Sequence, residues 1–125
     1  MREGILKKKI AVIGVSPRPE KFGHRIFSDL LKAGFDVEGI HPLGGEVSGR
    51  KIYRNLAELP QAPDLLITVV PHEATEKIVE EANRLGIKEI WMQPGSESDA
   101  AIENAKKYGI SVVHDACFMV HEGLW

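Results

Sequence analysis

The sequence lacks several features that define other classes of protein. It contains one cysteine in 125 residues, so a small fold held together by internal disulfides is excluded. Its formal net charge of −2 argues against a general nucleic-acid binder, which is usually basic. No segment approaches the roughly 20 apolar residues that span a bilayer, and the apolar run at 10–15 is too short for a signal-peptide core. We therefore expect a cytoplasmic protein with no membrane or nucleic-acid partner.

What the sequence does contain is an alternation of strand and helix patterns. Strands are expected at 10–15, 35–40, 64–70, 89–92 and 110–114, and helices at 24–33, 55–58, 73–85, 99–108 and 118–124. This alternation predicts a single α/β domain with helices on both faces of a mainly parallel, roughly five-stranded sheet. Segment 46–53 is expected to be irregular, with at most a short edge pairing, and Lys7, Lys8 and Lys9 to be a solvated flank.

The first exit loop, residues 14–25, is the stretch around which we expect the site to form. Ligands of open parallel sheets bind outside the carboxyl ends of the strands. This loop joins a buried strand to a helix start, where unpaired N–H groups and the positive end of the helix favour a phosphate. Arg18, Lys21, His24 and Arg25 add cationic side chains, which suit a pyrophosphate or a sugar phosphate.

The same loop lacks the common nucleotide-binding fingerprints. The dinucleotide pattern read from Gly14 requires glycine at Ser16 and glycine or alanine at Pro19. The Gly-Lys-Ser/Thr triplet of the P-loop is absent as well. An acid expected at the end of the second strand is replaced by His41, and Glu38 comes about three residues early. The loop therefore fits a phosphate compound other than NAD or a nucleoside triphosphate.

An ordered set of segments resembles the small stand-alone CoA-binding domain proteins. The matching segments are 10–19, 21–24, 40–42, 49–56, 69–71, 86–95 and 115–119, which cover nearly the whole chain. That family is similar to the CoA-binding domain of the succinyl-CoA synthetase alpha subunit. The resemblance implies a Rossmann-like three-layer fold with coenzyme A bound across the strand ends.

The resemblance also implies which residues contact CoA. Candidate phosphate contacts in the first exit loop are Gly14, Val15, Ser16, Arg18, Lys21 and His24. His41 and Pro42 are expected near the adenosine, Val70 and Pro71 beside the adenine or the pantetheine, and Gln93 and Gly95 along the next part of the groove. Many relatives have asparagine where this chain has His41.

Cys117, the only thiol, lies in the last exit loop and has three interpretations. It is a small buried residue that closes the last strand, or it pairs with His121 for nucleophilic catalysis. In the third, which the resemblance suggests, it contacts CoA and forms a reversible mixed disulfide with the CoA thiol. His72, His114 and Asp115 also lie at exit loops, but not at a recognised metal spacing, so no metal is expected.

The leading hypothesis is a module that binds CoA or acyl-CoA and does not turn it over alone. One alternative is a small NAD(P)-binding oxidoreductase or an accessory subunit of an acyl-CoA ligase, and another is an assembly protein with a vestigial pocket. The partner is then a small molecule, a second copy of the chain or an acyl-CoA enzyme. The apolar tail Leu124-Trp125 docks either on the domain's own core or on a second copy.

Overall fold

The computed structural model describes residues 2–125 and alternates strands with helices along the chain. The helices are α1 (Arg2–Leu6), α2 (Phe22–Lys32), α3 (His72–Leu85), α4 (Asp99–Lys107) and α5 (Phe118–His121), with a short 3-10 helix η1 (Leu56–Glu58). The strands are β1 (Lys9–Ile13), β2 (Asp36–Ile40), β3 (Glu46–Val47), β4 (Arg50–Tyr53), β5 (Leu65–Thr68), β6 (Glu89–Met92) and β7 (Ser111–Val113).

The strands form one seven-stranded sheet in the order β3-β4-β2-β1-β5-β6-β7. Only the β3–β4 pair is antiparallel; the other neighbours pair in parallel. β1 lies between β2 and β5, so the chain crosses from one side of β1 to the other. This reversal is the topological switch point, where ligands of such sheets bind.

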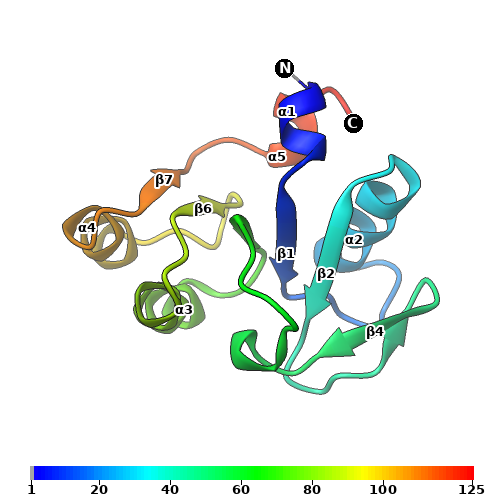
Figure 1. The fold of residues 1–125 in the computed structure, drawn as a ribbon, viewed down its shortest axis with the longest axis horizontal. Coiled ribbons are helices and arrows are strands. Elements are labelled where there is room, and N and C mark those ends of the chain that lie inside the picture. The colour runs from blue at the N-terminus through cyan, green and yellow to red at the C-terminus, as the bar shows by residue number, and fades with distance from the viewer. Residues whose placement is uncertain (1) are drawn as a thin grey trace.

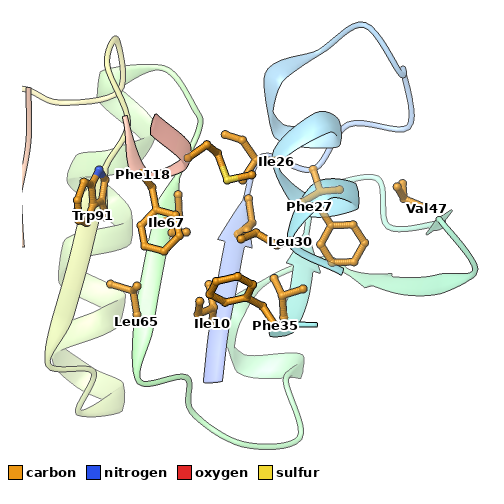
Figure 2. Packing of buried hydrophobic residues seen from close by; sticks show 14 of the residues in the cluster. Ile10, Ile26, Phe27, Leu30, Phe35, Val47, Leu65, Ile67, Trp91 and Phe118 are labelled. Carbon is orange, nitrogen blue, oxygen red and sulfur yellow. The ribbon is translucent and has the colours of Figure 1, made fainter. Parts of the chain in front are cut away.

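Two apolar clusters cover the two faces of the sheet, which confirms the predicted three-layer α/β fold. The course of the chain through the strands and helices is drawn in Figure 1. Ile10 and Val12 of β1 face the first cluster, with α2 and α5, while Ala11 and Ile13 face the second, with α3 and α4. This division follows from the alternation of side chains along a strand. Figure 2 shows Leu30 of α2 gathered in the first cluster with residues of the neighbouring strands.

The sheet has seven strands rather than the expected five because segment 46–53 forms the β3–β4 hairpin. Glu46 pairs with Lys51 and Val47 with Arg50, leaving Ser48 and Gly49 as the turn. Their φ values of 52° and 77° are those of the type I′ turn, which matches the twist of a hairpin. Serine at the first turn position gave little signal for this turn, because asparagine, aspartate or glycine usually occupies it.

The amino-terminal segment is also more ordered than the sequence predicts. Ile5 and Leu6 of α1 pack against the first core cluster. Lys8 forms an ion pair with Glu89, and Lys9 Nζ bonds to Asp36 Oδ2 at 2.9 Å. The lysine flank is thus partly engaged rather than simply solvated. Within residues 2–125, no helix has both the length and the apolar character that crossing a membrane requires.

The carboxyl-terminal segment folds back on this chain. The N–H groups of Leu124 and Trp125 both donate to the carbonyl oxygen of Met119, at 2.8 Å and 3.2 Å. Leu124 packs against the first core cluster. Both ends of the chain therefore lie near α1 and α5, at one end of the molecule (Figure 1). Of the two docking modes considered for the tail, the structure has the intramolecular one.

Candidate functional site at the carboxyl ends of the strands

Three adjoining hollows form a groove across the ends of β2, β1, β5 and β6. The larger hollow, of about 510 Å³, is lined by Gly14, Ser16, Lys21, Phe22, Gly23, His41, Pro42, Val69, Val70, Pro71 and Ala74. The cysteine hollow, of about 210 Å³, is lined by Phe22, Val69, Gln93, Pro94, Cys117 and Trp125. A third, of about 290 Å³, is lined by Val69, Val70, Pro71, Pro94, Gly95 and Ser96. Val69 lines all three, so the hollows adjoin at the end of β5.

Two glycines let the first exit loop lie against backbone. Gly14 has a φ of 111°, and a Cβ there would lie 2.1 Å from the carbonyl oxygen of Val69. A Cβ on Gly23 would lie 1.9 Å from the carbonyl oxygen of Gly14. Neither distance is compatible with a side chain, so the start of α2 is held directly against the end of β1. This close packing places the amino end of α2 at the floor of the groove.

Hydrogen bonds within the first exit loop fix its shape. Ser16 Oγ accepts from the backbone N–H of Arg18 at 3.1 Å, and His24 Nδ1 lies 2.9 Å from the carbonyl oxygen of Ser16. A carbonyl oxygen only accepts, so Nδ1 of His24 carries the proton in this bond. His24 therefore positions the loop. Lys21, the N-cap of α2, makes no side-chain capping bond, which leaves the helix end available to an anion.

The cations of this loop have different surroundings. Lys21 lines the larger hollow. Arg18 Nε instead bonds to Glu20 Oε2 at 2.8 Å. The pKa of Glu20 is lowered, mainly by a hydrogen bond from its own backbone and also by the charge of Arg18. The Arg25 guanidinium lies over the rings of Trp125 and Phe22, at 4.7 Å and 5.6 Å from their centroids.

Val15 lies beneath the loop rather than in the groove. Its side chain is fully buried in the first core cluster. Its backbone N–H and that of Gly14 both donate to the carbonyl oxygen of Ile40, at 3.0 Å and 2.9 Å. Val15 therefore joins the ends of β1 and β2, and in this conformation its N–H is already engaged.

His41 and Pro42 form the rim of the groove beyond β2. His41 Nδ1 accepts from the backbone N–H of Leu43 at 3.1 Å, so the proton of the neutral ring is on Nε2. An asparagine oxygen makes the same bond two residues along its own backbone in an Asx turn. Glu38 lines a separate hollow with Lys9 and Asp36, at the opposite ends of the strands.

Gln93 and Cys117 meet at the other end of the groove. Gln93 is 6% exposed; its Nε2 donates to Cys117 Sγ at 3.4 Å, and its Oε1 accepts from the Phe118 N–H at 2.7 Å. Gln93 therefore holds the last exit loop in place, while Cys117 is half-buried and faces the cysteine hollow. Gly95 and Pro71 line the third hollow.

The exit loop of β6 is tied to β5 by buried hydroxyls. Ser96 Oγ lies 2.7 Å from Thr68 Oγ1 and donates to the carbonyl oxygens of Thr68 and Gln93, both at 3.0 Å. The Ser96 hydroxyl has one proton, so it donates to one of these oxygens at a time. This network fixes the wall of the groove on the side of β6.

The histidines outside the groove have other partners. The ring of His121 packs against Trp91 at 5.2 Å, and its Nδ1 lies 3.2 Å from Glu122 Oε2. The backbone N–H of His121 donates to the carbonyl oxygen of Cys117 at 2.9 Å, but within the described residues no hydrogen bond joins the imidazole to the thiol. His72 lies 3.5 Å from Glu73, and His114 bonds to Asp115. Across residues 2–125, no three His, Cys, Asp or Glu side chains are grouped as a metal site requires.

Seven lining residues were not among the sequence-based candidates: Phe22, Gly23, Val69, Ala74, Pro94, Ser96 and Trp125. Phe22 follows the candidate Lys21, and Val69 precedes the candidate Val70. Extending each candidate segment by one residue includes both. Trp125 reaches the groove only because the tail folds back through Met119. No local pattern in the sequence indicates that return.

Comparison with known proteins identifies the family. Residues 8–122 match the profile of the CoA binding domain family, so the chain belongs to that family. This confirms the resemblance found in the sequence.

The relatives include ligase subunits and small stand-alone proteins. The chain is 30% identical to the alpha subunit of ADP-forming acetate–CoA ligase I from Pyrococcus furiosus, over 90% of this chain but 28% of that subunit. It is 27% identical to the uncharacterized protein YneT of Bacillus subtilis, over 90% of this chain and 84% of YneT. A solved structure of a conserved hypothetical protein from Pyrococcus furiosus has a TM-score of 0.86 and 38% identity, covering 91% of this chain and 98% of that one.

Proposed function

We propose that residues 1–125 form one CoA-binding domain that binds CoA or acyl-CoA in the groove and does not turn it over alone. The observation that best supports this is the set of adjoining hollows over four neighbouring strand ends in a member of the CoA binding domain family. An elongated ligand with charged, apolar and thiol parts suits a groove whose lining changes in the same order along its length.

The phosphates of CoA are proposed to bind the first exit loop. Gly14, Ser16 and Lys21 line the larger hollow beside the open amino end of α2. A helix end with unpaired N–H groups and a nearby lysine is a favourable environment for a pyrophosphate. Arg18 joins these contacts if it exchanges Glu20 for a phosphate, and Val15 and His24 shape the loop.

The remainder of CoA is proposed to run along the groove in both directions from that loop. His41 and Pro42 lie beside the adenosine at one rim. Val70, Pro71 and Gly95 line the path of the pantetheine toward β6. Cys117, held by Gln93, then lies where the CoA thiol ends.

At that end we include a reversible disulfide between Cys117 and CoA. In an oxidising mixture that contains CoA disulfide, the Cys117 thiolate attacks one sulfur of the disulfide. The new Cys117–CoA bond forms as the old S–S bond breaks, and the second CoA leaves as a thiolate. Intact-mass analysis should find one CoA-sized adduct on the wild type and none on Cys117→Ser. An unmodified wild type would contradict this part of the proposal.

Calorimetric titration with CoA, NAD and ATP tests the binding proposal. Saturable binding of CoA at micromolar concentration, with a matching rise in melting temperature, supports it. Binding of NAD in preference to CoA would instead support the oxidoreductase alternative. Titration with CoA that yields neither heat nor stabilisation would overturn the proposal.

An accessory role beside an acyl-CoA ligase is the second candidate function. It is supported by the similarity to a ligase alpha subunit, of which this chain spans 28%. The chain alone is then expected to form no acyl-CoA from acid, ATP and CoA, and to do so only with a separately supplied partner. Sedimentation of the chain alone, with and without CoA, would show whether it pairs with a second copy of itself. Sedimentation of its mixture with the supplied partner would show whether the two proteins associate.

A further inference from the structure

Trp125 lines the cysteine hollow and is held in place from two directions. Its backbone N–H donates to Met119 at 3.2 Å, which ties it to α5. Its indole Nε1 donates to Asp29 Oδ2 at 2.7 Å, which ties it to α2. The Arg25 guanidinium lies 4.7 Å from the ring, and the Phe22 ring lies 6.2 Å from it. The indole is 38% exposed, yet its position is set by a hydrogen bond, a cation–π contact and an aromatic contact.

The hollow that Trp125 borders is small and mainly apolar. Its volume is about 210 Å³, below the roughly 300–1,000 Å³ typical of pockets that hold drug-sized ligands. Phe22, Val69, Pro94 and Trp125 supply apolar lining, and the two polar lining residues, Gln93 and Cys117, bond to each other. It adjoins the larger hollow, because Phe22 and Val69 line both.

We propose that Trp125 is a specificity-determining residue that closes the thiol end of the groove. This inference rests on the proposed function. The groove then accepts CoA and short thioesters such as acetyl-CoA, and it rejects thioesters with a long aliphatic chain. A chain that extended past the hollow would have to displace the indole and break its bond to Asp29. A short acyl group occupies the hollow without moving the ring.

Titration of the wild type with CoA, acetyl-CoA and octanoyl-CoA tests this inference. We expect similar affinities for CoA and acetyl-CoA, and an affinity for octanoyl-CoA that is weaker by about tenfold or more, in the range that shape-based selection achieves. Trp125→Ala should remove this difference by strengthening octanoyl-CoA binding. Trp125→Phe retains an aromatic ring without the Nε1 donor and should give an intermediate ratio.

Leu85→Ala is the matched control, since Leu85 is on α3 and is 40% exposed, much like Trp125. It should retain the wild-type ratio of affinities. Equal affinity of the wild type for CoA and octanoyl-CoA would overturn the inference while leaving the proposed function intact. An unchanged ratio in both folded Trp125 variants would overturn it as well. Failure of the wild type to bind CoA at all would overturn the proposed function together with the inference.

Discussion

The hydrogen that Gly23 carries in place of a side chain faces the carbonyl oxygen of Gly14, and a Cβ at Gly23 would lie 1.9 Å from that oxygen. The contact joins the start of α2 to the end of β1 with no side chain between them. It is the closest of the approaches that shape the first exit loop, and the geometry of the proposed phosphate site depends on it.

Gly23→Ala is therefore expected to disrupt that site. The added methyl group meets backbone, which cannot rotate away, so overpacking should cost about 1–3 kcal/mol of unfolding free energy. CoA affinity should fall with it, because α2 must shift away from the groove. Denaturant unfolding and calorimetry measure the two effects. Gly4→Ala is the control, as a Cβ there meets nothing within 4 Å. Wild-type stability and affinity in Gly23→Ala would show that α2 does not need this contact.

Lys21→Ala is expected to weaken CoA binding through the loss of one charged contact. A hydrogen bond to a charged group contributes about 1.5–3 kcal/mol, which corresponds to roughly 10- to 100-fold in affinity. Added salt should also weaken CoA binding less in the variant than in the wild type, since the screened interaction is absent. Lys106→Ala, an exposed change on α4, is the control. An equal loss in both variants would point to a general charge effect rather than a contact at the loop.

His41 is expected to be replaceable by asparagine but not by alanine. Its Nδ1 accepts from the N–H of Leu43, and an asparagine oxygen supplies the same acceptor. His41→Asn should retain the affinity for CoA, while His41→Ala should lose about 2- to 10-fold as the rim loosens. Calorimetric titration of both variants with CoA measures the two affinities. A similar loss in both would mean that the imidazole itself contacts the ligand.

Gln93→Ala is expected to loosen the loop that carries Cys117. It leaves the buried N–H of Phe118 without the Gln93 acceptor, at a cost of about 1–3 kcal/mol. The yield or rate of the Cys117–CoA adduct should change, because the thiol is no longer held toward the groove. Unfolding and intact-mass analysis measure both. Gln61→Ala, an exposed change, is the control, and wild-type adduct formation by Gln93→Ala would contradict a positioning role.

The bond between Tyr108 and Glu80 predicts a change of stability at high pH. The Tyr108 hydroxyl donates to Glu80 Oε1 at 2.6 Å, which raises the pKa of the phenol above its ordinary value of 10.0. A raised folded-state pKa gives stability that is complete below the unfolded pKa and is lost as the pH rises through the folded one. The gap in stability between the wild type and Tyr108→Phe should therefore be constant to about pH 10 and narrow above it.

Urea unfolding of both proteins at a series of pH values from 7 to about 11, a range that spans the ordinary pKa of tyrosine, measures that gap. Tyr53→Phe is the matched control, because Tyr53 contacts Lys51 through its ring face, 4.9 Å from Nζ to the centroid. A gap that widens with pH would contradict the assigned direction of the Tyr108 pKa.

The parts of the fold that the sequence predicts are those with a long apolar pattern or a clear end signal. The runs that became β1 and β5 are apolar on both faces, as buried parallel strands are, and α3 ends at Gly86, whose φ is 75°. α2 begins at Phe22, two residues before the expected start, because Lys21 offers no capping signal. The five residues of α1 and the two of β3 are too few for periodicity to identify.

In the candidate site, too, some features can be predicted from the sequence and others cannot. Strand ends can be found from the sequence, and in the structure His41, Pro71, Gln93 and Cys117 line the hollows beyond the carboxyl ends of the strands. The directions of side chains cannot be found in this way. Arg25 turns toward Trp125 because the tail returns to α2, and that return depends on long-range packing of the chain.

The buried hydroxyl cluster of Ser96 and Thr68 has a consequence for the groove. It holds the β6 side of the groove through hydroxyl groups that water does not reach. The first exit loop is held by the packing of α2 on backbone and by an exposed and a partly buried hydrogen bond at Ser16. Water therefore competes for the bonds on one side of the groove and not for those on the other.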